Sequence, residues 1–534
     1  MNLGNNNTMC SLSRSQSLDR LRAGELWEIV VVGGGATGLG TAVDAAARGY
    51  RTALLEARDF ASGTSSRSTK LIHGGVRYLA QGNLALVREA LRERGLLMQN
   101  APHLVRRREF VVPAYHFWQL PYYGTGLWLY DRLAGDLSLG RSRWISKTEA
   151  ISRVPPLRAS GLRGGIVYSD GQFDDARLAI TLARTLADSG GLALNHMPVI
   201  ALGNEGGRLN GVRARDAETG EEFTVRARAV INATGVYADA IRRLDEPGCQ
   251  PMITPSQGAH VVLDRSFLAG ETAIMVPRTD DGRVLFAIPW GDRVLVGTTD
   301  TSVATLPFEP RPLRMEIDFL LEHLGRYVSK SPLRSDIKSM FAGLRPLLSR
   351  PGQEGTSTAL LSREHAVVVS QSGLVTVTGG KWTTYRPMAK EAVDHAARLA
   401  RLPGRPCPTA TRKLHGWEKQ EDGQTSHLGE YGTDRRGLQS LMTDHPGWAQ
   451  LIHPSLPYSG AEVIWAVRHE AARTVEDVLA RRTRALFLDA KASMEAAPAV
   501  AELLAQEMGR DTAWQAGEIA QFRELARGYT AEEL

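Results

Sequence analysis

The stretch that decides the fold runs from residue 29 to residue 38 and reads Ile29-Val-Val-Val-Gly-Gly-Gly-Ala-Thr-Gly38. An apolar run typical of a buried strand leads directly into three spaced glycines, Gly33, Gly35 and Gly38. This order makes a tight turn, lets the backbone approach a pyrophosphate closely, and starts a helix whose N–H groups point at the phosphates. The stretch therefore predicts a dinucleotide-binding unit.

The next apolar strand, Thr52-Ala-Leu-Leu-Glu56, ends in an acid eighteen residues after Gly38. A carboxylate at this place can accept hydrogen bonds from both hydroxyls of an adenosine ribose. We therefore expect a ribose without a 2′-phosphate, as in FAD or NAD, and not NADP. Glycines alone could mark a turn of no consequence, but here the strand, the glycines and the distal acid occur in the right order.

A polar loop from Ala61 to Tyr78 follows this strand and is crowded with hydroxyl residues. Hydroxyls and backbone N–H groups in such a loop can reach the ring and phosphates of a flavin, and glycines let the chain pass close to a flat ring. A solvated turn is the alternative. The residues that we assign to cofactor contact in this loop are Thr64, Ser65, Ser66, Lys70, His73, Gly74 and Gly75.

A second glycine turn lies near residue 380. The apolar run Leu374-Val-Thr-Val-Thr378 predicts a strand that enters Gly379-Gly380, and a helix is expected to begin near Tyr385. Lys381 and the N–H groups of this turn could stabilise the negative charge of a reduced flavin. The alternative is a capped strand-to-helix turn with a solvated lysine.

Three further stretches, read together with the polar loop, carry a family resemblance: Gly297-Thr-Thr-Asp300, Phe341-Ala-Gly-Leu-Arg345-Pro and Gly379-Gly-Lys-Trp-Thr-Thr-Tyr-Arg386. With them the chain resembles the FAD-dependent glycerol-3-phosphate dehydrogenases from about Glu28 to about Thr411, and more weakly beyond. The resemblance implies oxidation of sn-glycerol 3-phosphate to dihydroxyacetone phosphate with FAD as cofactor and a membrane quinone as electron acceptor. The resemblance makes a homodimer possible but does not decide the oligomeric state.

The resemblance also implies site residues. Oxidising a secondary alcohol needs a base, a hydride acceptor and cations for a dianionic phosphate. We assign His260, Arg345 and Lys381 to catalysis, and the sequence leaves open whether His260 or Arg345 takes the hydroxyl proton. The substrate contacts that we expect are Arg77, Arg363, Thr298 and Thr299, and the further cofactor contacts are Gly33, Gly35, Gly38, Glu56, Gly235, Gly380, Lys381 and Thr383.

The expected fold class is α/β. Apolar strands at 260–263, 273–277, 284–288 and 294–297 predict an antiparallel sheet that interrupts a Rossmann-like FAD-binding domain, and the resemblance implies a substrate domain of the D-amino-acid-oxidase type. A helical C-terminal domain follows over 411–534. The FAD-binding parts are expected at about 27–115, 160–250 and 355–405, the substrate parts at about 116–159 and 251–354, and a disordered extension at 1–26.

Composition narrows the class of partner. The 534 residues are 43% hydrophobic and 23% charged, which is ordinary for a globular protein of two or three units. The net charge of +6 favours anionic ligands or an anionic membrane surface. We find no basic and aromatic module that would recognise nucleic acid. Cys10, Cys249 and Cys407 are far apart, so we expect a reducing compartment and no metal or disulfide.

Location follows from three sequence features. No apolar run of about 18 residues occurs, so membrane contact would be peripheral. Leu120–Tyr130, rich in Tyr and Trp, is the segment expected at the membrane, and an aromatic core cluster is the equal alternative. The N-terminal arginines would suit a mitochondrial transit peptide. The calcium-binding pattern of the mitochondrial relatives is missing, so we expect a bacterial, cytoplasmic enzyme on the inner face of the cell membrane.

Three alternatives remain at the level of sequence. An oxidase variant would share the substrate contacts and hand electrons to O2. An amine or hydroxy-acid oxidase of the same broad fold would not need several phosphate-binding arginines. A regulator that binds a nucleotide without catalysis would need neither a base nor a phosphate clamp.

Overall fold

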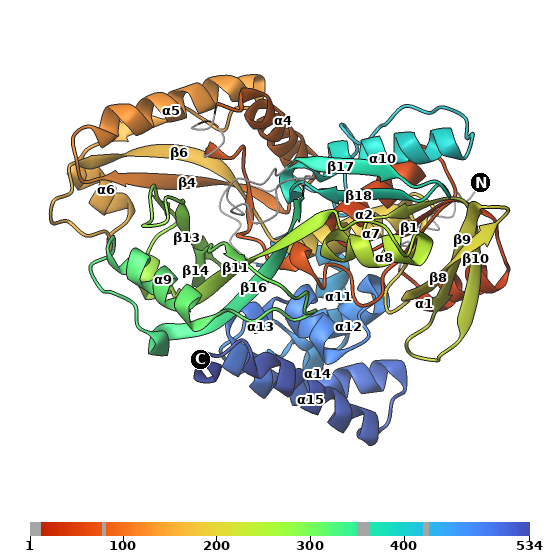
Figure 1. The fold of residues 1–534 in the computed structure, drawn as a ribbon. Helices are drawn as coiled ribbons and strands as arrows, with labels where there is room; N and C mark the ends of the chain where they lie inside the picture. Colours follow the sequence, from red (N-terminus) through yellow and green to blue (C-terminus); the bar gives the residue numbers. More distant parts are fainter. Residues whose placement is uncertain (1–11, 77–78, 80–81, 350–363, 420–426) are drawn as a thin grey trace, which may run out of the picture.

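The computed structural model describes residues 12–76, 79, 82–349, 364–419 and 427–534. It contains two mixed sheets that lie side by side, with helices above them and a helical unit below (Figure 1). The glycine-rich stretch starts the first sheet, and the strands around His260 belong to the second.

The first sheet has the strand order β17-β18-β10-β1-β2-β7. Its central strands are parallel and almost wholly buried, which explains the unbroken run of valines in β1. A hairpin of β8 and β9 extends from β10. The bounds are β1 Trp27–Val32, β2 Thr52–Leu55, β7 Leu192–Leu194, β8 Val199–Glu205, β9 Arg208–Arg215, β10 Glu222–Asn232, β17 His365–Val369 and β18 Val375–Gly379.

Alanine-rich helices cover this sheet because small side chains let helix and sheet backbones approach closely. Helix α2 (Ala36–Ala47) packs between α7 (Asp175–Asp188) and α10 (Tyr385–Leu399), and their alanines share one core with Ile29 and Val31. Helix α8 (Ala238–Asp245) follows β10. The strand and helix predicted around Gly379-Gly380 are confirmed by β18 and α10.

The second sheet has the order β15-β11-β14-β13-β12-β4-β6-β3, with β16 paired to β11 and β5 to β6. The predicted antiparallel strands are confirmed. The bounds are β3 Leu71–Ile72, β4 Val105–Ala114, β5 Arg143–Ile145, β6 Gly164–Phe173, β11 Ile253–Asp264, β12 Ala273–Val276, β13 Leu285–Trp290, β14 Arg293–Gly297, β15 Thr301–Ser302 and β16 Ile337–Leu348. Helices α4 (Leu84–Asn100), α5 (Gln119–Ala134), α6 (Lys147–Arg153) and α9 (Arg314–Gly325) cover it.

Two predicted boundaries are wrong. Strands β4 and β6 were expected in the FAD-binding parts 27–115 and 160–250, but they lie in the second sheet, where β4 pairs with both β6 and β12. Residues 14–22 of the expected disordered extension form α1 (Arg14–Arg22). Ser13 caps this helix, and the buried Leu18 and Leu21 join the core beneath the first sheet. Residues 1–11 lie outside the described residues.

The C-terminal part is helical, as predicted. Its elements are α11 (Arg435–Asp444), α12 (Gly460–Glu470), a π-helical turn (Asp477–Arg482), α13 (Ala485–Leu488), α14 (Ala490–Met508) and α15 (Thr512–Arg527). Val262 and Phe341 of the second sheet join its apolar core, so the unit is packed against the sheets and not tethered loosely. Within the described parts of the chain, no helix has the length and apolar character needed to span a bilayer.

Candidate active site

Two adjoining cavities lie where the sheets meet. The first, of about 290 Å³, is built mainly on the second sheet. The second, of about 360 Å³, lies at the carboxyl ends of β1 and β2, where open parallel sheets bind nucleotides. The two share six lining residues, Thr64, Arg67, Pro346, Gly380, Lys381 and Trp382. One extended ligand can therefore occupy both.

The second cavity fits a dinucleotide. Gly33 has φ +107°, and a Cβ there would lie 2.7 Å from the Ala233 carbonyl oxygen. A Cβ on Gly38 would collide with the Gly33 carbonyl, so Gly38 packs the helix against the strand and does not line the cavity. Gly33, Gly35 and Gly235 do line it. Gly33 leaves no room for a side chain and Gly35 little, so the backbone can make the close approach that a pyrophosphate requires.

Glu56 lies directly after β2 and lines the second cavity. Its carboxylate accepts hydrogen bonds from the Gly34 N–H at 2.5 Å and the Arg58 N–H at 2.9 Å. Burial raises the pKa of Glu56, while these two N–H groups oppose the rise. The side chain is thereby held beside the glycine turn, in the position expected for a ribose contact.

Some residues of the polar loop line the cavities, and others hold the loop in place from behind. Thr64 donates to the Leu344 carbonyl at 2.6 Å, and Ser65 accepts from the Ala36 N–H at the start of α2, at 2.9 Å. The Trp382 indole donates to the Ser65 carbonyl at 2.9 Å and ties this loop to the second glycine turn. Among the loop residues predicted to contact the cofactor, those that line a cavity are Thr64, Ser65, His73 and Gly75.

Three predicted loop contacts need correction. Lys70 is wholly buried behind the loop, where its ammonium donates to Asp175 at 2.7 Å and to the Ser66 carbonyl at 2.8 Å. Burial lowers the pKa of Lys70 to about 7, and Asp175 opposes the fall. Gly74 donates to the Tyr130 hydroxyl at 2.7 Å. Lys70, Ser66 and Gly74 line neither cavity, so they support the loop from behind.

His260 projects from β11 into the first cavity and is 2% exposed. Its ring stacks on Phe341 with centroids 4.8 Å apart, and Nε2 lies 3.0 Å from the Thr69 hydroxyl. Burial lowers the pKa of His260 well below its ordinary value, and Lys70 and Arg345 add to the fall. The imidazole is therefore neutral at neutral pH and can accept a proton.

Arg345 projects from β16 into the same cavity. One terminal nitrogen donates to the Gln257 carbonyl at 3.1 Å, and the other donates to the Thr298 hydroxyl at 3.0 Å and the Thr299 carbonyl at 2.8 Å. Asp300 lies 3.5 Å away. The guanidinium is thus held in one orientation, with its charge available to a developing oxyanion.

Thr298 and Thr299 both line the first cavity. The Thr299 hydroxyl accepts from the Ala259 N–H and donates to Glu316, each at 2.8 Å, so its bonds are spent on the protein. The Thr298 hydroxyl accepts from Arg345 at 3.0 Å and donates to the Thr299 carbonyl at 3.2 Å, so both threonine hydroxyls are bonded to the protein at the cavity wall.

Arg283 is a cavity residue that the sequence reasoning missed. It precedes β13 and donates to the Asp300 carbonyl at 2.9 Å, with the Asp300 carboxylate 3.7 Å away. Asp300 thus lies between Arg283 and Arg345. The acid belongs to the quoted Gly297-Thr-Thr-Asp300 stretch, but no pattern in the sequence identifies its arginine partner.

The second glycine turn forms the junction of the cavities. Gly380 and Lys381 line both, and Thr383 lines the first. Gly380 has φ +68°, and a Cβ there would collide with Met388. The predicted phosphate contacts Arg77 and Arg363 lie outside the described residues. The described part of the chain therefore brings His260, Arg345, Thr298 and Lys381 together around one cavity.

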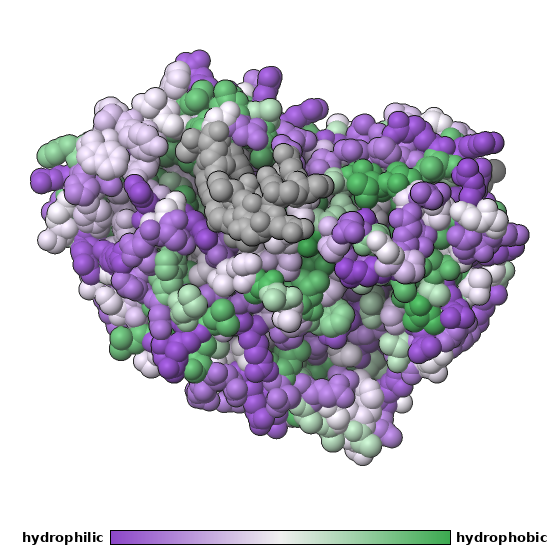
Figure 2. Space-filling model, viewed as in Figure 1, coloured by the Kyte–Doolittle hydropathy of each residue, from purple (hydrophilic) through white to green (hydrophobic). Residues whose placement is uncertain are grey.

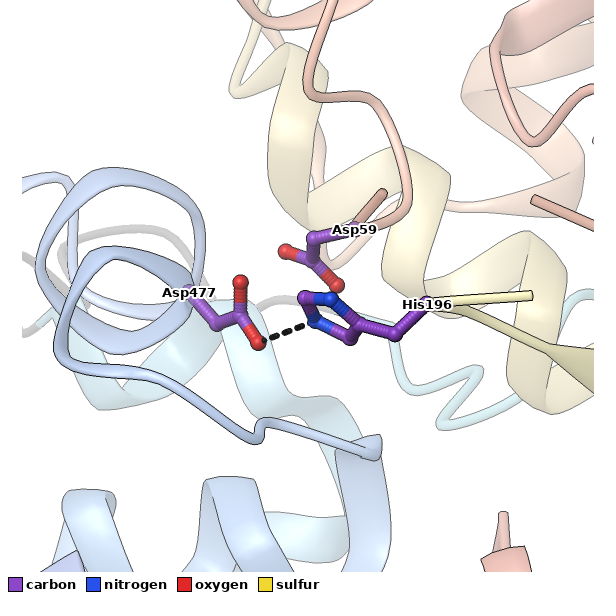
Figure 3. A group of neighbouring side chains, drawn as sticks. All are labelled: Asp59, His196 and Asp477. Atoms are coloured by element: carbon purple, nitrogen blue, oxygen red, sulfur yellow. Dashed lines mark hydrogen bonds and ion pairs between the residues drawn. The ribbon is translucent and has the colours of Figure 1, made fainter. Parts of the chain in front are cut away.

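A separate buried cluster joins the polar loop to the C-terminal unit. Asp59, His196 and Asp477 offer ligand atoms within 4.8 Å of one another, and His196 Nε2 lies 2.9 Å from Asp477 (Figure 3). Arg481 and Arg482 pair with Asp59, and Arg481 also pairs with Asp477 at 2.8 Å. The carboxylates are neutralised by guanidinium groups, so the cluster fits an interdomain ion-pair network better than a cation site.

Comparison with known proteins agrees with this geometry. Residues 28–386 match the FAD dependent oxidoreductase family, and residues 376–515 match the C-terminal domain of alpha-glycerophosphate oxidase. A probable mitochondrial glycerol-3-phosphate dehydrogenase of Caenorhabditis elegans is 40% identical over 96% of this chain and 74% of its own length. The mitochondrial glycerol-3-phosphate dehydrogenase of Rattus norvegicus is 40% identical over 94% and 73%.

Solved structures point the same way. The glycerol-3-phosphate dehydrogenase of Bacillus halodurans, complexed with FAD, aligns with a TM-score of 0.80 and 27% identity over 98% of both chains. The L-alpha-glycerophosphate oxidase of Mycoplasma pneumoniae shares the fold, with a TM-score of 0.55 and 17% identity over 73% of this chain and 98% of its own. With its glycine-lined double cavity and these relatives, the chain belongs to the family of FAD-dependent glycerol-3-phosphate dehydrogenases.

Proposed function

We propose that this enzyme oxidises sn-glycerol 3-phosphate to dihydroxyacetone phosphate in the first cavity, with FAD extending from there into the second, and that the electrons pass to a membrane quinone. The observation that carries the proposal is the meeting of His260, Arg345 and Lys381 at a cavity that continues into the glycine-lined one. When bound, FAD supplies the hydride acceptor.

The residues divide the remaining chemistry. Loss of hydride from the substrate's secondary carbon requires that its hydroxyl lose a proton. His260 takes this proton, because its imidazole is neutral, whereas a guanidinium stays protonated at any physiological pH. Arg345, held by Thr298 and Thr299, stabilises the alkoxide that forms. Lys381 and the glycine turn line both cavities and would stabilise negative charge on the flavin ring when FAD is bound.

Phosphate recognition falls to Arg77 and Arg363, with Arg283 as an additional cation in the cavity wall. The test is steady-state kinetics of Arg363→Lys and Arg77→Lys with the flavin content measured first. A lost guanidinium fork lowers kcat/KM for glycerol 3-phosphate by about tenfold to 200-fold. If both variants keep the wild-type value, the phosphate is bound elsewhere.

The electron acceptor separates the proposal from its main alternative. The C-terminal match to alpha-glycerophosphate oxidase favours O2 as a second candidate acceptor. After anaerobic reduction by glycerol 3-phosphate, the dehydrogenase should be reoxidised faster by a soluble quinone analogue than by air-saturated buffer in a stopped-flow mixer. The opposite order would identify an oxidase.

Contact with an anionic membrane surface completes the proposal. The exposed aromatics on and beside α5 are Phe117, Trp118, Tyr122, Trp128 and Trp144. Arg132 lies 4.9 Å over the Trp128 ring and Arg163 4.7 Å over Phe117, so cations and rings mix on this face. Figure 2 shows pale colours over α5 at the upper left, the intermediate hydropathy of such residues, which suits a headgroup zone.

For the compartment we propose the cytoplasmic side of a bacterial cell membrane. The alignment with a bacterial dehydrogenase over 98% of both chains supports this, whereas the curated relatives named above are mitochondrial. A homodimer is part of the same proposal. Fractionation of the producing cells tests the compartment, and sedimentation of the purified enzyme tests the homodimer.

A further inference from the structure

A short segment at residues 307–310, which we term the strap, lies along the second cavity. Pro307, Phe308, Glu309 and Pro310 all line it. The Phe308 ring stacks on Tyr237 with centroids 4.7 Å apart, and the Arg58 guanidinium lies 4.1 Å from the same ring. The Tyr237 hydroxyl donates to the Pro307 carbonyl at 3.1 Å. The strap therefore bridges the chain after β2 and the chain after β10.

Glu309 fastens the strap at its other end. One carboxylate oxygen accepts from Arg67 at 2.6 Å, and the other accepts from the Tyr529 hydroxyl at 2.6 Å. Arg67 lines both cavities and also donates to the Ser62 carbonyl at 2.5 Å. The carboxylate thus connects the polar loop of the cofactor site to Tyr529, five positions before the last residue of the sequence.

Tyr529 is itself held firmly. It is 4% exposed, its ring lies against Phe487 with centroids 5.3 Å apart, and its carbonyl accepts from the Met340 N–H of β16 at 2.9 Å. A Cβ on the preceding Gly528 would lie 2.8 Å from the Arg311 guanidinium, next to the strap. Burial and then Glu309 raise the pKa of Tyr529, so its hydroxyl stays protonated and donates.

We propose that Tyr529, through Glu309 and Arg67, fastens the strap over the adenosine diphosphate half of the cofactor, so that the C-terminal segment controls how fast FAD leaves the enzyme. The proposal rests on the assignment of the second cavity to that half of FAD. FAD leaves by this route only when the strap lifts, and lifting breaks the Glu309 contacts and the Phe308–Tyr237 stack. Tyr529 and Phe308 are positioning residues in this scheme, remote from the reacting atoms.

The test compares holoenzyme variants by the rise in flavin fluorescence after dilution into buffer without FAD. Tyr529→Phe keeps the ring packed and removes one charge-assisted hydrogen bond, so release accelerates about tenfold or more. Phe308→Ala removes the stack and accelerates release as well. In a double-mutant cycle, Tyr529→Phe with Glu309→Gln accelerates release by less than the product of the two single effects. The matched control is Tyr122→Phe, an exposed tyrosine on α5.

Two further readouts separate fastening from general stability. With saturating FAD, kcat of Tyr529→Phe stays at the wild-type value, because the reacting groups are untouched. Wild-type release rates in both Tyr529→Phe and Phe308→Ala would overturn the proposal. Faster release in Tyr529→Phe but not in Phe308→Ala, together with a lower melting temperature of the Tyr529→Phe holoenzyme, would also overturn the proposal. A wild-type protein that binds no FAD would instead overturn the proposed function.

Discussion

At the scale of single residues, the environment of His260 decides its chemistry. The ring is buried between Phe341 and the cavity, with Lys70 and Arg345 as nearby cations. All three influences disfavour the imidazolium. A histidine in this setting stays a competent base at acidity that would protonate an exposed one.

This environment predicts a shifted pH profile. The folded-state pKa of His260 lies below the ordinary value, so the neutral form is present at high pH and persists as the pH falls below about 6.5. The His260 limb of kcat/KM should therefore lie below pH 6.5, and His260→Gln should lower kcat by about 10²- to 10⁴-fold. Kinetics from pH 5 to pH 8 at constant flavin content measure both. A limb at or above pH 6.5 that vanishes in His260→Gln would contradict the assignment.

Arg345 gives a second prediction at this scale. Lysine keeps the charge but cannot bridge the Gln257 carbonyl and the Thr298 hydroxyl together, so the cation loses its orientation. Arg345→Lys should lower kcat/KM by about tenfold to 200-fold. Arg334→Lys is the matched control, because Arg334 pairs with Asp318 at the surface. Equal kinetics in the two variants would remove Arg345 from the reaction.

At the scale of elements, residues 481–484 of the C-terminal unit hold the chain that leads from β2 into the polar loop. Arg481 and Arg482 of the π-helical turn both pair with Asp59, which lies just after β2. Arg484 adds a bond to the Ser66 carbonyl at 2.8 Å. The cofactor loop is thus positioned by residues more than 400 positions away in the sequence.

Breaking this network should be costly. Asp59→Asn leaves the buried Arg482 guanidinium without its carboxylate, while Arg481 keeps Asp477, and lowers the free energy of unfolding by about 3–5 kcal/mol. The matched control, Asp318→Asn, breaks a surface ion pair and should change the free energy of unfolding by less than about 1 kcal/mol. Denaturant unfolding of both variants in excess FAD gives the comparison. A similar loss of unfolding free energy in the two variants would show that the buried ion pairs stabilise the protein no more than the surface pair does.

Helix α5 gives the other prediction at this scale. Tyr122 and Trp128 are 61% and 55% exposed, whereas Tyr130 is buried against Asp170, at 2.8 Å. The predicted membrane segment is therefore two-sided, and only its outer face is available to lipid. Tyr122→Ser with Trp128→Ser should reduce flotation with anionic liposomes.

Met315→Ser serves as the matched control for α5, because Met315 is 69% exposed on α9, away from the aromatic face. This change should leave flotation as it is. If the α5 double variant floats as well as the wild type, the aromatic face is not the membrane contact.

At the scale of the whole molecule, His103 lies where the second sheet meets the C-terminal region. Its ring is 1% exposed, and Cβ atoms added to Gly416 and Gly432 would lie 3.5 Å and 3.1 Å from it. Burial, then Arg177 and His415, lower the pKa of His103 to about 4. The unfolded chain binds a proton there near pH 6.5, and the folded protein does not.

The lowered pKa of His103 makes the folded protein less stable at acidic pH. The contribution of neutral His103 to stability is fully present above about pH 6.5 and is lost as the pH falls towards 4, amounting to about 2 kcal/mol between pH 7 and pH 5. His103→Gln should therefore lose less unfolding free energy over that range than the wild type. The control is His116→Gln, an exposed histidine. Parallel pH dependence in wild type and His103→Gln would contradict the shift.

The sequence by itself determined the local geometry of both glycine turns. The runs before Gly33 and Gly379 predicted strand, turn and helix correctly, because steric restriction and the unpaired N–H groups of a helix start act between residues close in the chain. Glu56 lines the second cavity, and its contact with a ribose stays a prediction. The family was recognised by resemblance, from the polar loop together with the stretches 297–300, 341–346 and 379–386, and the comparisons confirm it.

Only the tertiary structure decided which distant residues meet. The strand pattern of β4 and β6 is the same whichever sheet they join, so their place in the second sheet could not be read from periodicity. Lys70 was predicted to contact the cofactor, but in the folded protein it is buried and forms an ion pair with Asp175. The pairings of Arg283 with Asp300, of Arg481 with Asp59 and of Tyr529 with Glu309 depend on packing, because one charge can find many partners and burial selects among them.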